Sequence, residues 1–348
     1  MMLSLKYRRC LSWGLSCFAF SIPSISMADE SSDCAEEQNP RGCESSRLSS
    51  PFRTYPASPL QAMTLTTQLR SGELVDDAEL FFMASAASVW IQNRDFQFDY
   101  YQNQAVSGIA WRVNDDWSAE VKYQLAWSAN NHLDTLTIDF HDWVGISQNG
   151  RLDKDKHQNN IDSPLYNVHI NNFESEIMVS AIHGYVQWQA FRTASQALTI
   201  GATLYYNKVN DSAFANSSFE QGLQANYSFF HGPHSLFTTV GGTLHSADEH
   251  IFQDLPVKRF TGAWAFGYGY RFAANHELML EYHGYEGLLE DDSEFSKSSQ
   301  EVLLGYRYYL KDLAQIEAAA TENIYNMGNS TDILFSLGLR FFLGSISN

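Results

Sequence analysis

The sequence lacks any hydrophobic run that could cross a membrane as a helix, once residues 1–28 are set aside. No run of about 18 apolar residues occurs in the rest of the chain, and a transmembrane helix needs at least that many. Positive charge is also scarce, because 22 Lys and Arg residues stand against 40 Asp and Glu residues. Nucleic-acid-binding proteins need clustered Lys and Arg, so the sequence predicts no nucleic acid partner.

Cysteines and catalytic motifs are few. Of four cysteines, only Cys34 and Cys43 lie beyond residue 28, and in an exported protein we expect them to form a disulfide. The chain has no Gly-x-Ser-x-Gly and no His-Glu-x-x-His sequence, motifs typical of serine hydrolases and zinc proteases. We therefore predict neither a metal nor a cofactor, and an enzyme is the less favoured class.

The first part of the chain is typical of export. Residues 1–28 combine a basic start, a short apolar stretch and Ser26-x-Ala28, and predict a cleaved signal peptide. Pro23 and several serines interrupt the apolar stretch, which argues against a permanent anchor. Residues 29–59 are rich in Ser, Pro and acids and lack periodicity, so they predict a polar periplasmic tail that carries the two cysteines.

From about residue 78 onward, apolar and polar side chains alternate, as they do in strands that separate two media. In GAWAFGYGYRF (262–272) a ring at every second position alternates with small residues and one arginine. Residues 117–127 alternate in the same way, with a Trp at each end. Twelve segments show the pattern: 79–92, 98–113, 117–127, 176–191, 198–206, 223–229, 235–245, 262–272, 278–282, 302–309, 314–323 and 333–342.

The connections between these segments alternate in length. Those that join even to odd segments are short, whereas those that join odd to even segments are mostly long and polar, the longest being 129–175. This asymmetry is typical of outer-membrane barrels. The two Trp residues that bracket 117–127 would lie about 25 Å apart along the barrel axis at a tilt of about 40°, which matches the distance between the aromatic girdles.

We therefore predict an all-β fold: a transmembrane antiparallel outer-membrane β-barrel of 12 strands over residues 78–343, with short periplasmic turns and long extracellular loops. Residues 344–348 form a short tail. The expected location is the cell outer membrane, and the expected partners are its lipids, lipopolysaccharide and the barrel-assembly machinery. A secreted β-sandwich that binds ligands is an alternative, but it does not explain the alternation of loop lengths.

Charged residues occupy several positions that alternate with the lipid-facing ones. The predicted lumen residues are Glu120, Lys122, Arg271, Glu277, Glu281, His283, Glu301, Arg307, Glu317 and Arg340. Acids and bases are mixed, which favours a salt-bridged filling over a selectivity lining of one sign. Residues 60–77 precede the first strand and could add a plug inside the lumen.

Two segments, SPLQAMTLTTQLRSGEL (58–74) and IDFHDWVGISQNGR (138–151), resemble the marker segments of a domain-of-unknown-function family of Gram-negative proteins. The resemblance extends from about residue 58 to the C-terminus and implies an exported or outer-membrane protein, with no activity to carry over. Its loop motif comprises Phe140, His141, Asp142, Trp143, Gly145, Gly150 and Arg151. A metal or catalytic cluster of Asp139, His141, Asp142 and His157 is one interpretation; a loop cap fixed by hydrogen bonds is favoured.

The predicted function is passive: a narrow channel for small solutes, or a structural component of the membrane. The solute is not identified by the sequence. An outer-membrane lipolytic or other hydrolytic enzyme is the alternative from another class, and it would need a serine activated by histidine near the outer rim. His245 and Ser246 are the nearest to such a pair.

Overall fold

The computed structural model describes residues 49–133, 135, 158–246, 255–311, 313–331 and 333–344. All of them belong to one structural unit, residues 41–348. Several expectations lie outside the described residues and stay predictions: the signal peptide, Cys34 and Cys43, and the loop motif with Phe140, His141, Asp142, Trp143, Gly150 and Arg151.

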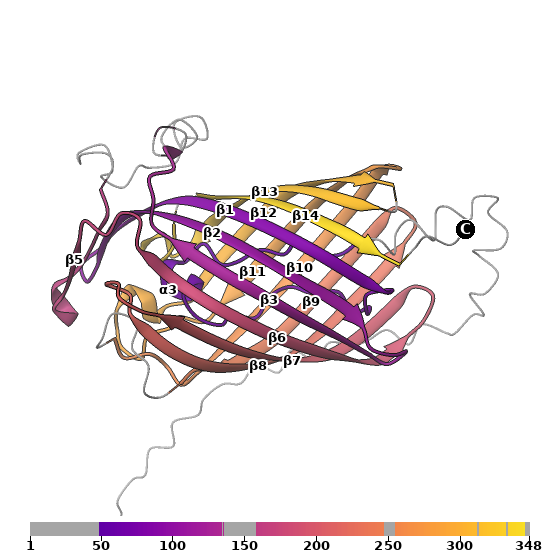
Figure 1. The fold of residues 1–348 in the computed structure, drawn as a ribbon, viewed down its shortest axis with the longest axis horizontal. Coiled ribbons are helices and arrows are strands. Elements are labelled where there is room, and N and C mark those ends of the chain that lie inside the picture. Colours follow the sequence, from indigo (N-terminus) through magenta and orange to yellow (C-terminus); the bar gives the residue numbers. More distant parts are fainter. Residues whose placement is uncertain are drawn as a thin grey trace, which may run out of the picture. The chain divides into compact units, whose positions relative to one another are not determined.

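Twelve long strands form one antiparallel sheet that closes on itself (Figure 1). They are β1 (Ala78–Gln92), β2 (Gln97–Arg112), β3 (Trp117–Trp127), β6 (Ile177–Arg192), β7 (Gln196–Val209), β8 (Asn216–His231), β9 (His234–Leu244), β10 (Phe260–Ala273), β11 (His276–Tyr285), β12 (Ser299–Leu310), β13 (Ala314–Tyr325) and β14 (Ile333–Leu343). Each pairs with its neighbours in sequence, and β1 pairs with both β2 and β14, which closes the ring. The predicted 12-stranded barrel is confirmed.

A short hairpin that the alternation did not predict lies inside the long loop 129–175. It consists of β4 (Asn160–Ser163), the 3₁₀ turn η2 (Pro164–Tyr166) and β5 (Val168–Asn171). The hairpin continues the sheet beyond the barrel, because β4 pairs with the start of β2. Ile161 and its partner Phe98 are both fully buried there, so apolar packing rather than periodicity holds the hairpin in place.

The connections define two ends of the barrel. At one end the turns are short, and they comprise 113–116, 193–195, 232–233, 274–275 and 311–313. At the other end the connections are 93–96, 128–176, 210–215, 245–259, 286–298 and 326–332, and they carry η3 (Glu294–Ser296) and η4 (Met327–Asn329). We call these the short-turn end and the long-loop end; in outer-membrane barrels the short turns face the periplasm.

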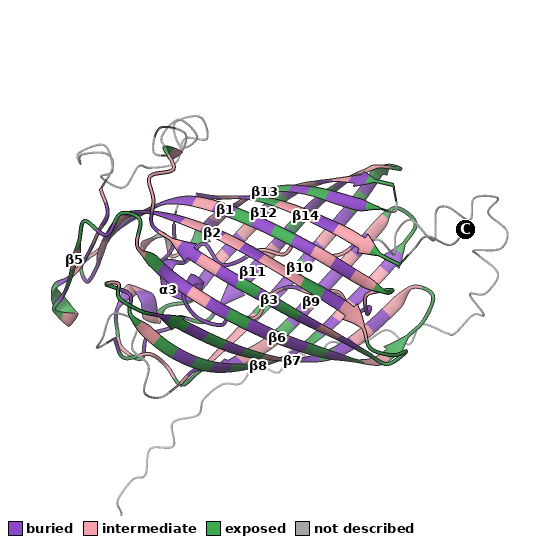
Figure 2. Cartoon of the chain, viewed as in Figure 1, coloured by how far each residue is buried: buried purple, intermediate pink, exposed green. Residues whose placement is uncertain are grey.

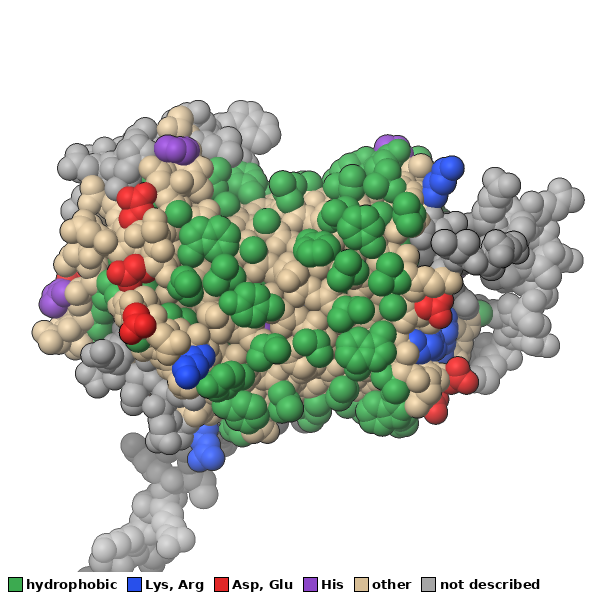
Figure 3. Space-filling view, in the orientation of Figure 1, with side chains coloured by type: hydrophobic (Ala, Val, Ile, Leu, Met, Phe, Trp, Pro, Cys, Tyr) green, Lys and Arg blue, Asp and Glu red, His purple; other side chains and the backbone are tan. Residues whose placement is uncertain are grey.

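The outer wall of the barrel is apolar. On β10 the rings of Trp264, Phe266 and Phe272 are 42–50% exposed, whereas Ala265 and Gly267 between them are buried. Figure 2 shows this alternation along the strands, and Figure 3 shows apolar side chains over the middle of the barrel with charged ones toward its two ends. So much exposed apolar surface on a closed sheet is wetted by lipid rather than water.

None of the helices among the described residues is long and apolar enough to span a bilayer.

The lumen is filled by the segment that precedes β1. Residues 49–73, which we call the plug, are buried or half-buried throughout and contain one helical turn, α3 (Pro59–Ala62). In Figure 1 this indigo segment runs inside the ring of strands. The sequence analysis assigned residues 49–59 to a periplasmic tail, and this boundary is wrong. These residues belong to the plug inside the barrel. Their lack of periodicity reflects burial on all sides, not exposure to water.

Candidate functional site

The plug enters the barrel at the short-turn end and ascends along β11 and β12. The Ser49 hydroxyl lies 2.9 Å from Ser235 Oγ, at the first residues of β9, and donates to the carboxylate of Glu277. The backbone N–H of Phe52 donates to Glu281 Oε1 at 2.8 Å. Further up, the N–H groups of residues 57 and 58 donate to Glu301 Oε1 at 3.0 and 3.1 Å.

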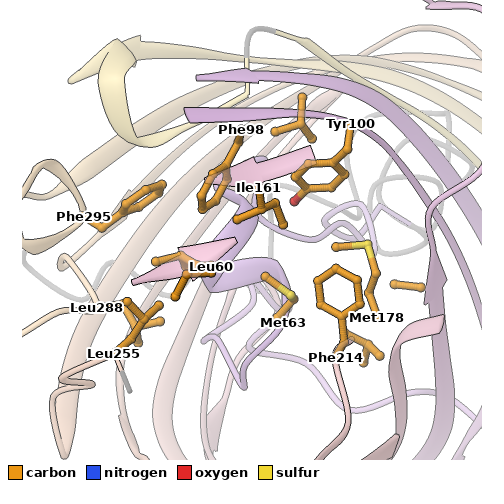
Figure 4. Packing of buried hydrophobic residues seen from close by; sticks show 14 of the residues in the cluster. Leu60, Met63, Phe98, Tyr100, Ile161, Met178, Phe214, Leu255, Leu288 and Phe295 are labelled. Atoms are coloured by element: carbon orange, nitrogen blue, oxygen red, sulfur yellow. The ribbon is translucent and has the colours of Figure 1, made fainter. Parts of the chain in front are cut away.

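The plug turns back at α3, near the long-loop end. Figure 4 shows Leu60 and Met63 surrounded by apolar side chains from the upper strands and loops, which include Phe98, Ile161 and Phe295. The Tyr205 hydroxyl donates to the carbonyl of Met63 at 3.3 Å. The tip of the plug is therefore seated in an apolar cap at this end of the lumen.

The plug then descends along β8, β9 and β6. The N–H of Leu65 donates to Glu220 Oε2 at 3.0 Å, and the N–H of Gly72 donates to Ser228 Oγ at 2.7 Å. Glu73 forms an ion pair with Arg192, the last residue of β6, at 3.1 Å. Since Arg192 precedes a short turn, the plug is a hairpin with both ends at the short-turn end.

Four lumenal glutamates accept hydrogen bonds from uncharged groups of the plug, and three of them accept from its backbone. Glu220, Glu281 and Glu301 accept main-chain N–H groups, and Glu277 accepts a hydroxyl. Buried N–H groups need acceptors, and carboxylates make strong ones. The barrel thus supplies the hydrogen bonds that an extended, non-periodic segment would otherwise obtain from water.

Two arginines of the plug share one site on the barrel wall. Arg70 forms a two-pronged pair with Glu120 at 2.8 and 3.0 Å. Arg53 pairs with Glu79 at 3.0 Å and also contacts Glu120. Arg53 lies 3.8 Å above the ring of Phe81, and Arg70 lies 3.9 Å above the ring of Tyr185. We call Glu79, Glu120, Phe81 and Tyr185 the arginine site.

Strand register assembles the arginine site. Glu79 on β1 is opposite Ala110 on β2, which is opposite Glu120 on β3, which is opposite Tyr185 on β6. Three of the four residues therefore lie in one row, and the small Ala110 leaves the carboxylates facing each other. Phe81 lies one row above, over Gly108, where a β-carbon would be 2.4 Å from the ring. Glycine is required there because the ring lies directly on the backbone.

A second ionic cluster lies at the short-turn end. Arg307 is fully buried and pairs with Glu277 and Glu317, each at 2.7 Å. Arg340 pairs with Glu317 at 3.0 Å and donates to the carbonyl of plug residue 51. Arg271 lies 3.7 Å above the ring of Tyr309. In these ion pairs both partners belong to the barrel wall, whereas Arg53 and Arg70 belong to the plug and pair with the wall across the lumen.

One ion pair fastens the loops at the long-loop end. Lys258 Nζ lies 3.0 Å from Glu286 Oε1, and the N–H of Gly262 donates to Glu286 Oε2 at 3.0 Å. Partial burial acts to raise the pKa of Glu286, but the Gly262 N–H and the Lys258 ammonium outweigh it. The pKa of this carboxyl is therefore lowered.

All ten lumen residues of the sequence analysis are buried in the structure: Glu120, Lys122, Arg271, Glu277, Glu281, His283, Glu301, Arg307, Glu317 and Arg340. The sequence analysis missed Glu79, Glu220, Arg53 and Arg70. Extending the alternation of 223–229 toward the N-terminus would have placed Glu220 on the lumenal face. No periodic signal marks the two arginines, because the plug is not a strand.

His245, considered above as a partner for Ser246, has another role. It is buried and bonds to Glu220 at 2.6 Å and to Thr261 at 2.8 Å. Within the described part of the chain, no group of three or more His, Cys, Asp and Glu residues is placed to hold a metal ion.

Little free space remains along the plug. One cavity of about 80 Å³ is lined by plug residues and by the arginine-site residues Glu79, Glu120 and Tyr185. A second, of about 10 Å³, lies between the plug tip and the ends of β9 to β11. Each of these two cavities holds a few water molecules at most.

The chain is similar to one protein family and, at low identity, to several solved structures. A family model described as a protein of unknown function (DUF3187) matches residues 44–343, which confirms the resemblance drawn from the sequence. No curated protein matches the chain. Similar solved structures include the NanC porin, with a TM-score of 0.46, 8% identity, and coverage of 76% of this chain and 100% of the porin. An outer-membrane channel from Pseudomonas putida F1 of the COG4313 group has a TM-score of 0.46 and 11% identity, with coverage of 80% and 98%. The transport unit of the autotransporter AIDA-I from Escherichia coli has a TM-score of 0.47 and 8% identity, with coverage of 82% and 95%.

Proposed function

The chain belongs to the DUF3187 family, and from that premise we propose that this outer-membrane barrel is a channel for small solutes, closed at rest by its own plug. The barrel wall is the conduit and residues 49–73 are the gate. Solutes cross when the hairpin leaves the lumen toward the periplasm.

The path of the plug is the observation that carries this proposal. Both ends of the hairpin lie at the short-turn end, and only its tip reaches the apolar cap. A hairpin with this path can withdraw without threading through the long loops. The contacts between its described residues and the wall are hydrogen bonds, ion pairs and apolar packing, all of which can re-form.

The filled lumen also supports a second candidate, a structural component of the membrane that never opens. The two candidates differ in one measurable property. A gated channel conducts ions when the plug is loosened, whereas a structural barrel does not conduct under any condition that leaves it folded.

Planar-bilayer recording of the refolded full chain tests the proposal. We expect rare, brief openings from the wild type and far more frequent ones from the double variant Arg53→Ala, Arg70→Ala. Removing both guanidinium groups leaves Glu120 buried without them, a cost of about 3–5 kcal/mol. That cost corresponds to at least about 100-fold more open time.

Arg94→Ala is the matched control, because the Arg94 side chain is 83% exposed in the turn between β1 and β2. It removes the same guanidinium group from outside the lumen and is expected to leave the openings unchanged. Silence of both wild type and double variant, with the barrel shown to be folded, would refute the channel and leave the structural role.

A further inference from the structure

Resting on the proposed channel function, we infer that the open lumen selects for cations, and that the arginine site binds the guanidinium or ammonium group of a small organic cation in transit. In the closed state the two arginines of the plug occupy that site. They hold the position that the solute takes when the plug withdraws.

The charge of the barrel wall is the first support. Among the described strand residues, the buried acids are Glu79, Glu120, Glu220, Glu277, Glu281, Glu301 and Glu317, and the buried bases are Lys122, Arg271, Arg307 and Arg340. Seven acids against four bases give the wall a formal charge of −3, with histidines neutral. Arg53 and Arg70 of the plug reduce this excess in the closed state, so withdrawal of the plug exposes it.

The construction of the arginine site is the second support. It combines two carboxylates with two aromatic faces, and both rings already carry a guanidinium at 3.8–3.9 Å. Carboxylates bind a planar cation through paired hydrogen bonds, and aromatic faces attract its charge. A neutral solute of the same shape gains neither the ion pair nor the cation–π attraction. The adjoining cavity of about 80 Å³ is lined by the same carboxylates.

Carboxylates also mark the rest of the path. Withdrawal of the plug removes the N–H donors of Glu220, Glu281 and Glu301. One base, Lys122, lies on the same face of β3 as Glu120, and its Nζ donates to Gln68 of the plug at 2.6 Å. The open lumen therefore presents acids at several levels, and a cation is passed from one to the next.

Arg307 and Arg340 of the wall give no comparable site for anions. Arg307 lies between Glu277 and Glu317, and Arg340 pairs with Glu317, so each keeps a carboxylate partner after the plug leaves. An anion entering this lumen would have to displace a buried ion pair. A cation finds carboxylates that have lost the donors supplied by the plug.

Reversal potentials measured in a KCl gradient test the selectivity. In the open background Arg53→Ala, Arg70→Ala, we expect K⁺ to be at least about threefold more permeant than Cl⁻. Adding Glu301→Gln to that background should lower the ratio. A permeability ratio at or below one would overturn the inferred selectivity while leaving the channel itself intact.

A competition measurement tests the site independently of conductance. In detergent, the full chain with all four native cysteines (Cys10, Cys17, Cys34 and Cys43) replaced by serine carries Ala62→Cys as a reporter, because residue 62 is buried at the plug tip. We expect about 20 mM guanidinium chloride to at least double the rate of maleimide labelling. Equal concentrations of urea, which has the same planar shape but no charge, and of KCl should leave the rate unchanged.

Glu120→Gln in the reporter background should raise the basal rate and abolish the response to guanidinium. Equal responses to guanidinium, urea and KCl would overturn the binding site. Absence of conductance from every folded variant would refute the channel function, and the selectivity with it. The labelling result would still decide whether the arginine site binds a cation.

Discussion

Replacing Phe52 should weaken docking of the plug to the barrel wall. Its ring is 4% exposed and packs in an apolar cluster with Leu69 of the plug and Phe237 and Leu303 of the wall. It lies on Gly305, which has no side chain to fill the space. Phe52→Ala therefore leaves a cavity that the wall cannot close.

A buried Phe→Ala change costs about 3–5 kcal/mol where the site does not collapse. Because the ring joins the plug to the wall, we expect most of that cost to fall on docking of the plug. At 1.4 kcal/mol for each factor of ten, the undocked fraction should rise at least about 100-fold. The Ala62→Cys reporter measures this fraction, since labelling follows the population of the opened state.

Phe82→Ala is the matched control, because Phe82 on β1 is 45% exposed to lipid. It deletes the same ring from the outer face and should leave the labelling rate unchanged. If Phe52→Ala labelled no faster than Phe82→Ala, docking of the plug would not depend on this contact, and the reasoning about its seat would be wrong.

Three further results are expected. Gly305→Ala should raise the labelling rate as Phe52→Ala does, since a β-carbon would lie 2.4 Å from the Phe52 ring. Gly184→Ala, where a β-carbon would have nothing within 4 Å, should leave the labelling rate unchanged. Leu223→Arg, at a position 62% exposed near the middle of β8, should lower the free energy of unfolding in vesicles by about 2–4 kcal/mol, whereas Leu165→Arg, 56% exposed in η2, should not. Glu286→Gln should lower the melting temperature near neutral pH, and the difference from wild type should vanish on acidification. The lowered pKa of Glu286 means that its contribution is present above the unfolded carboxyl's pKa and is lost as pH falls through the folded value.

The barrel was accessible to sequence reasoning because lipid imposes a simple rule. Every second side chain of a strand such as β10 must be apolar, so the parity of Trp264 and Phe266 also places Arg271 and Gly267 on the other face. The same parity put Glu120, Glu281 and Glu301 together in the lumen. Loop lengths then separated the short-turn end from the long-loop end, without any knowledge of contacts.

The plug was only partly accessible, and its boundary was wrong for 49–59. A segment enclosed by the wall needs no apolar stripe of its own, so composition alone makes it resemble a disordered tail. One signal was available: the wall holds more acids than bases, and buried carboxylates need donors. An excess of lumenal acids thus predicts a segment inside the barrel that supplies donors, as the main-chain N–H groups of the plug do for Glu301. The β4–β5 hairpin gave no comparable signal.

Residues 74–77 join the plug directly to β1, so in the proposed channel the gate is tethered to the wall that it closes. Recapture after each opening is then an intramolecular event, with a local concentration that for short flexible links is on the order of millimolar. In the proposed channel, closure by a tethered plug does not weaken on dilution. In the proposed channel, a solute that binds the open lumen must compete with this local concentration of the plug. The channel would then conduct at high external solute concentrations and stay closed at low ones.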